Sequence, residues 1–178
     1  MKFVIAALAL GLLIAVSFAQ DAPLEPEYVN QAYLLKDGKI EKTEIATIKF
    51  QTKTTNHFIT VKGTSSEVVL GSRSPVRVPP DAHFIVRLPS SDVDPSTLIK
   101  LQVFRIGKDD REFLMHTAKA HIYGGVSSTP TDDAGVPITI KKYGAKSLEI
   151  IPNAPLAPGE YFFPASGMQA DCFGVDVK

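Results

Sequence analysis

The 178-residue sequence has no tryptophan, one cysteine and no net charge, since 19 basic residues match 19 acidic ones. The single cysteine excludes an intramolecular disulfide, so the fold must be stabilised by an apolar core. The zero net charge gives no reason to expect nucleic acid or an anionic membrane surface as a partner. The lack of tryptophan lowers the expectation of a carbohydrate platform, because sugars stack on flat aromatic rings.

The common catalytic signatures are also missing. The sequence has no G-x-S-x-G, S-x-x-K, H-E-x-x-H, Walker A or G-x-G-x-x-G pattern. This does not exclude an enzyme whose acid and base lie far apart in the chain. From the residues alone we predict no catalytic residue, no cofactor and no metal site.

Several residues have side chains that could bind a metal ion or act in catalysis. Cys172 and a histidine can form a reactive pair, but Cys172 stands beside Phe173 in an expected strand, which favours a buried small hydrophobe. His116 and His121 have an odd spacing that places them on opposite faces of a strand. Four loop acids suggest calcium, although aspartate is also a common turn residue: Asp92, Asp94, Asp132 and Asp133. Five arginines alternate with apolar neighbours, and most of them are expected to face solvent: Arg73, Arg77, Arg87, Arg105 and Arg111.

The first 19 residues predict export. Met1-Lys2 is a short basic start, Phe3 to Val16 is apolar apart from Gly11, and Ser17-Phe18-Ala19 has small residues where signal peptidase requires them. We divide the chain into a signal peptide (1–19), an N-terminal tether (20–27) and one β-sandwich domain (28–178). The unpaired thiol and the lack of an Asn-x-Ser/Thr sequon favour a bacterial periplasmic or secreted protein.

The rest of the chain is typical of an all-β protein. Its 13 prolines and most of its 12 glycines interrupt short runs rich in valine and isoleucine, which disfavours long helices. We expect eight or nine strands at the spacing of a β-sandwich. Asp37-Gly38 predicts a hairpin turn, and hairpins are also expected for 98–106 with 111–118 and for 136–143 with 147–151. Three prolines mark an edge or crossover: Pro75, Pro79 and Pro80.

Other local patterns predict where strands end. Alternation of Ala46, Ile48 and Phe50 favours one half-buried strand over Ile40 to Gln51. We expect the polar stretch Thr52 to Asn56 to be a turn and Gly63 to end the next strand. The segment Gly124 to Gly135 is expected to be the longest flexible loop.

The run Leu156-Ala157-Pro158-Gly159-Glu160-Tyr161 resembles the tyrosine corner of immunoglobulin-like sandwiches. We therefore predict an immunoglobulin-like Greek-key β-sandwich. In addition, Pro158-Gly159-Glu160-Tyr161 followed by Cys172-Phe173-Gly174-Val175-Asp176 is similar to the ending of uncharacterised bacterial secreted proteins. The segments Leu34 to Lys39 and Asp94-Pro95-Ser96 show the same similarity. The resemblance implies a fold and a compartment and transfers no site residue.

These features favour an exported, non-catalytic binding or structural module of the bacterial cell envelope, contacting another envelope protein through an edge strand or loops. The alternative is a small secreted enzyme or a ligand- or carbohydrate-binding protein with a site in the loops around 124–135.

The signal-peptide assignment makes a first prediction. Expressed from its own Met1 in a Gram-negative bacterium, the protein is expected in the periplasm or medium with Gln20 as its first residue. Intact mass and N-terminal sequencing check this. A cell-bound product that retains Met1 would contradict it.

Overall fold

The computed structural model describes residues 23–90, 94–121, 123–130, 135–165 and 167–177. The expected signal peptide lies outside these residues. Strands make up most of the described chain, and its only helix is the four-residue α1 (Pro95–Leu98). The prediction of an all-β protein is therefore confirmed. Among the described residues, no helix has the length and apolar character needed to span a membrane.

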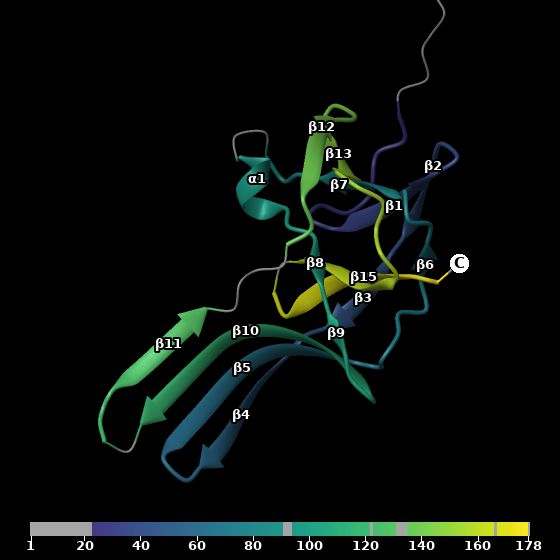
Figure 1. The fold of residues 1–178 in the computed structure, drawn as a ribbon. Coiled ribbons are helices and arrows are strands. Elements are labelled where there is room, and N and C mark those ends of the chain that lie inside the picture. Colours follow the sequence, from purple (N-terminus) through teal and green to yellow (C-terminus); the bar gives the residue numbers. More distant parts are fainter. Residues whose placement is uncertain (1–22, 91–93, 122, 131–134, 166, 178) are drawn as a thin grey trace, which may run out of the picture.

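The strands form three sheets (Figure 1). The outer sheet has, in spatial order, β12 (Ile138–Lys142), β13 (Ser147–Pro152), β7 (His83–Arg87), β1 (Ala32–Lys36) and β2 (Lys39–Lys42). The middle sheet has β3 (Glu44–Thr47), β15 (Gln169–Val175), β14 (Gly159–Pro164) and β8 (Gln102–Val103), with β6 (Arg77–Val78) parallel to β15. The arm sheet has β11 (Val126–Pro130), β10 (Asp110–His121), β5 (Thr60–Leu70) and β4 (Lys49–His57), with β9 (Arg105–Ile106) paired to β10.

The middle sheet is covered on both faces. Side chains alternate along a strand, so Tyr161 and Phe163 of β14 pack in the core shared with the outer sheet, whereas Phe162 packs against the base of the arm sheet. The strand β15 divides in the same way, with Phe173 on the first side and Cys172 on the second. This explains why almost every residue of these two strands is buried.

Aromatic contacts join the layers. In the core between the outer and middle sheets, the ring centroid of Phe84 lies 5.2 Å from that of Phe163 and 4.6 Å from that of Phe173. On the other face of the middle sheet, Phe162 stacks on Phe104 at 4.1 Å. Cys172 is fully buried there, and burial raises the pKa of its thiol to about 12. The expectation that Cys172 is a buried small hydrophobe is confirmed.

Several local expectations are confirmed. Asp37 and Gly38 both have positive φ and form a two-residue turn, with Lys36 opposite Lys39. The hairpin expected for 136–143 with 147–151 is formed by β12 and β13, in which Ile140 lies opposite Ile150. The hydroxyl of Tyr161 donates a 2.7 Å hydrogen bond to the carbonyl of Ala157, as expected from the local pattern around Pro158-Gly159.

In the hairpin expected between 98–106 and 111–118, the first strand is shorter than predicted. Only Arg105 and Ile106 pair with β10, because residues up to Leu98 belong to α1 and β8 pairs with β14. The expected proline-flanked edge is present as the two-residue strand β6.

The strand expected over Ile40 to Gln51 is wrong, because this segment contributes to all three sheets as β2, β3 and the start of β4. Ala46 and Ile48 are buried as predicted, but Phe50 is 63% exposed. The alternation of buried and exposed side chains ends at Phe50, because there the chain leaves the outer and middle sheets and enters the arm sheet.

The expected turn at Thr52 to Asn56 and the expected strand end at Gly63 are also wrong. Residues 52–56 lie within β4, and Gly63 lies within the continuous strand β5. The expected loop Gly124 to Gly135 contains β11, which pairs with β10 from Val126 to Pro130, while 131–134 lie outside the described residues. Polar β-branched residues form strands here because both sides of the arm face water and backbone pairing alone sets their conformation.

Candidate functional site: a projecting arm anchored by buried charges

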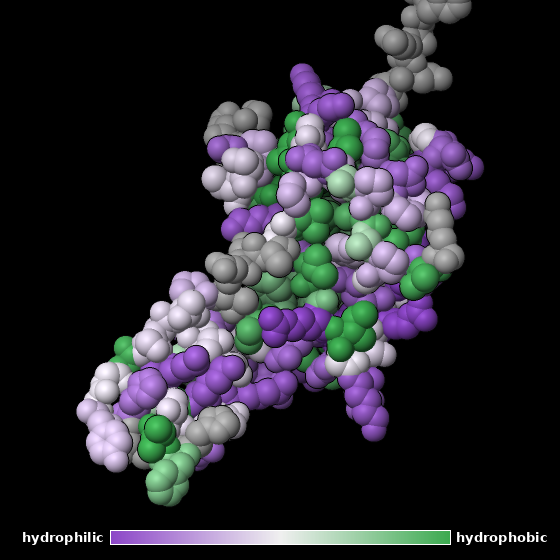
Figure 2. Space-filling model, viewed as in Figure 1, coloured by the Kyte–Doolittle hydropathy of each residue, from purple (hydrophilic) through white to green (hydrophobic). Residues whose placement is uncertain are grey.

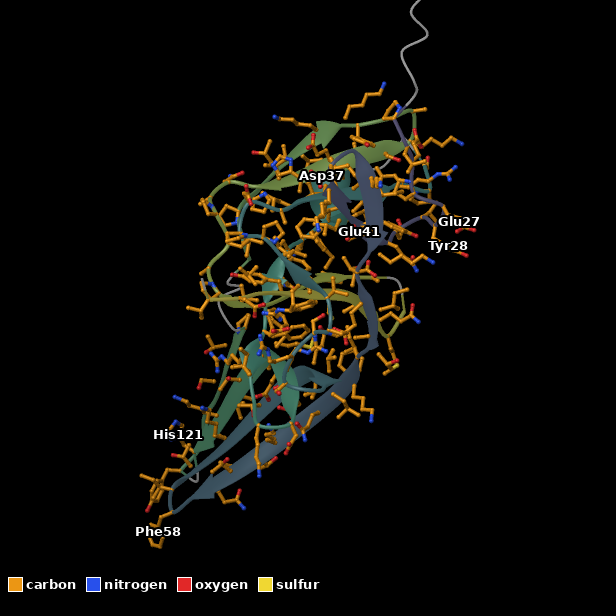
Figure 3. The ribbon with its side chains drawn as sticks, turned by 90° about the vertical axis from the view of Figure 1, so that its right-hand side faces the viewer. Glu27, Tyr28, Asp37, Glu41, Phe58 and His121 are labelled. Atoms are coloured by element: carbon orange, nitrogen blue, oxygen red, sulfur yellow. The ribbon has the colours of Figure 1, made fainter. Side chains whose placement is uncertain are left out.

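The arm sheet extends well beyond the body formed by the outer and middle sheets (Figures 1 and 3). We call residues 51–65 and 116–130 the distal arm. Every distal-arm residue whose side chain is described is exposed or partly exposed. Backbone pairing therefore holds the distal arm together, without a core of its own.

A β-bulge in β10 separates the distal arm from the base of the arm sheet, which packs on the middle sheet. The pairing of β10 with β5 shifts between Leu114 and His116, which leaves Met115 as an extra residue. On the body side of this bulge, Val69 and Phe113 belong to the apolar cluster with Phe162. Bulges bend strands and increase their twist, so this one marks where the arm departs from the middle sheet.

The distal arm ends in two adjacent turns with exposed apolar side chains. Thr60 pairs with His121, which places the β4–β5 turn beside the β10–β11 turn. Figure 3 shows Phe58 and His121 at this far end, and Figure 2 shows a few hydrophobic residues there among more hydrophilic ones. Phe58 is 97% exposed and Tyr123 90% exposed. With Ile59 and Val126 they form a set that we call the apolar tip: Phe58, Ile59, Tyr123 and Val126.

Apart from its histidines, the charged residues of the distal arm are all lysines. The distal arm contains no aspartate or glutamate but has three lysines. Lys53 pairs with Glu112 at 3.2 Å, near the body. Lys62 and Lys119 lie directly opposite each other on β5 and β10, and neither has a carboxylate within 4 Å among the described residues. Like charges in opposed positions destabilise a strand pair, so fold stability does not account for this arrangement.

Arg111 anchors the arm sheet to the middle sheet. Its side chain is completely buried and makes two hydrogen bonds with Glu44, Nη1 to Oε2 at 2.8 Å and Nη2 to Oε1 at 2.9 Å. Nε donates to the carbonyl of Gly71, and the guanidinium lies 5.7 Å from the ring centroid of Phe104. Arg111 is therefore an exception to the expectation that most of these arginines face solvent. A buried arginine is tolerated here because its charge is paired and its donors have acceptors.

Glu160 continues this network into the body. Its Oε2 lies 3.7 Å from Nη1 of Arg111 and accepts a 2.8 Å hydrogen bond from the backbone N–H of Ser74. Its Oε1 pairs with Arg77, whose other terminal nitrogen reaches Asp176. The guanidinium of Arg77 lies over Gly174, where a Cβ would overlap it. The Pro-Gly-Glu-Tyr and Cys-Phe-Gly-Val-Asp motifs thus meet in one charge network.

The carboxyl groups of Glu44 and Asp171 have pKa values shifted in opposite directions. Burial acts to raise the pKa of Glu44, but hydrogen bonds from Arg111 and Ser74 outweigh it and lower that pKa. For Asp171, burial raises the pKa to about 6, although its Oδ2 accepts a 2.8 Å hydrogen bond from the N–H of Ala32. Asp171 lines an open hollow of about 470 Å³ together with Leu88 and Phe163.

The remaining acidic and histidine side chains described here do not form a common site. Asp94 caps α1, accepting hydrogen bonds from Ser96, which lower its pKa. Asp92, Asp132 and Asp133 lie outside the described residues. His83 bonds one carboxylate, Glu149, at 2.8 Å. In the described part of the chain, no three His, Cys, Asp or Glu side chains are grouped as a metal site would require.

Gly174 provides a test of the charge network. Gly174→Ala should destabilise the fold by about 2–4 kcal/mol, because the new methyl group must separate Arg77 from Glu160. Gly63→Ala is the matched control, since a Cβ there has no heavy atom within 4 Å, and should change stability by less than about 1 kcal/mol. Urea denaturation measures both. Equal effects of the two substitutions would contradict this assignment.

Asp171 predicts a pH dependence. A pKa of about 6 in the fold against 3.8 in the unfolded chain means that the protonated form is favoured in the fold, so stability falls as pH rises from about 4 to 6. Asp171→Asn removes this titration and keeps an acceptor for Ala32. Relative to the unaltered protein it should gain about 1–3 kcal/mol at pH 7 and little at pH 4. A pH-independent difference in urea denaturation would contradict this.

Comparison with known proteins identifies no family for this chain. No family model, curated protein or solved structure matches it. Its contacts, exposure and charge distribution therefore supply the evidence for a function.

Proposed function

We propose that the protein is an exported, non-catalytic binding module of the bacterial cell envelope, and that the arm is its binding element. One observation carries this proposal: the apolar tip stands at the end of an arm that has no core of its own. Phe58 and Tyr123 contribute almost nothing to packing while exposed. Monomeric proteins rarely gather exposed apolar side chains unless these meet a partner.

We also propose that the body is an immunoglobulin-like Greek-key sandwich. The order β12-β13-β7 in one sheet and β8-β14-β15 in the other corresponds to D-E-B and C-F-G of that fold. The parallel pairing of β6 with β15 and the bond from Tyr161 to Ala157 support this correspondence. The arm is then an elaboration of the sandwich, built from β4–β5 between β3 and β6 and from β9–β11 between β8 and β12.

The placement of charge favours binding over catalysis. The buried charges of Arg111 and Glu160 lie in one network of ion pairs with Glu44 and Arg77, which stabilises the attachment of the arm. The alternative site at 124–135 is less favoured, because its described residues up to Pro130 form the last turn and edge strand of the arm. Tyr123, beside that turn, is part of the apolar tip instead.

Sedimentation with washed envelope fragments of a Gram-negative bacterium tests the proposal. The mature chain, residues 20–178, should pellet with the fragments. Phe58→Ser/Tyr123→Ser should reduce the bound fraction about tenfold or more, because two buried apolar contacts are lost.

Leu98→Ser/Val177→Ser is the matched control. These two side chains are also exposed and apolar, but they lie on the body. The control should pellet like the unaltered protein, and melting temperatures should show that both variants fold. Binding that is unchanged in the tip variant, or equally weakened in the control, would refute the arm as the binding element.

A further inference from the structure

The distal arm separates apolar and cationic groups along its length. We infer that the partner of the apolar tip is the surface of a lipid bilayer that contains anionic lipids. This inference rests on the proposed function, since it names the partner of the same arm.

The first support is the shape of the tip. Phe58 and Tyr123 stand on two neighbouring turns, and Thr60 Oγ1 lies 3.3 Å from Nδ1 of His121 between them. A narrow end with outward-pointing apolar side chains can enter the boundary between headgroups and acyl chains, where aromatic residues are favoured. Val61 and Val126, both opposite Ala120, extend the apolar surface on one face.

The second support is the distance between the turns and the lysines. Lys62 and Lys119 lie two residues behind the Thr60–His121 pair, which is about 7 Å along the strands. Apolar side chains that bind at a membrane surface enter by about 5–10 Å. When the tip is inserted to that depth, both lysines reach the level of the lipid phosphates.

The third support is the charge of the distal arm. It has no carboxylate over two stretches of fifteen residues, 51–65 and 116–130, although the whole chain is neutral. The opposed lysines repel each other in the free protein. Anionic headgroups between them relieve this repulsion, and each lysine near such a surface strengthens binding. An acidic protein partner with an apolar patch would satisfy the same groups, and protein-free vesicles distinguish it from a bilayer.

The absence of tryptophan allows a direct test. Phe58→Trp places one fluorophore at the tip, and Val177→Trp places one on the body as a control. With protein-free vesicles of phosphatidylcholine and phosphatidylglycerol, emission of Phe58→Trp should shift to the blue and be quenched by brominated acyl chains. Emission of Val177→Trp should not change, and vesicles of phosphatidylcholine alone should bind Phe58→Trp much more weakly.

Charge variants complete the test. In the Phe58→Trp background, Lys62→Gln/Lys119→Gln should weaken vesicle binding about fivefold per lysine. Lys141→Gln/Lys142→Gln, on exposed residues of β12, should leave it unchanged.

Failure of this inference is distinguishable from failure of the proposed function. No blue shift with anionic vesicles, or no effect of the Lys62 and Lys119 changes, would overturn the bilayer as partner. If the protein still pellets with envelope fragments through its tip, the binding role stands and the partner is a protein or polysaccharide. If tip-dependent pelleting is also absent, both fail.

Discussion

The ion pair between Arg111 and Glu44 is the constraint on which the arrangement of the molecule depends. It joins β10 of the arm sheet to β3 of the middle sheet in the interior, where removing one partner of a buried pair typically costs about 3–5 kcal/mol. Glu160 extends the same network to Arg77 and the last strand. An arm without a core can keep a fixed direction because its base is held in this way.

The parts of the fold that the sequence predicted are those determined by neighbours in the chain. Asp37-Gly38 sets a turn through its own backbone preferences, and the bond from Tyr161 reaches only four residues back. In both cases the deciding interaction spans a few residues. The burial of Cys172 follows from its place beside Phe173 in an expected strand, although the side chains that cover it, such as Phe104, are distant in the sequence.

The arm could not be predicted because its determinants are distant in the sequence. Thr52 to Asn56 has the composition of a turn, and only pairing with β5 makes it a strand. Arg111 has the alternating context of a solvent-facing residue, and only Glu44, 67 positions away, explains its burial. Likewise, the zero net charge of the whole chain does not show that the distal arm has lysines and no carboxylates. This becomes clear only when the strand register places Lys62 opposite Lys119.

The lack of a core in the distal arm has an evolutionary consequence. A substitution at a solvated side chain of a backbone-paired strand changes stability little, so the distal arm is free to accumulate changes that alter what it binds. Substitutions at Arg111 or Gly174 lack this freedom, because each disturbs a buried charge. Selection can therefore retarget the tip while the attachment of the arm is preserved, which separates the evolution of binding from the evolution of the fold.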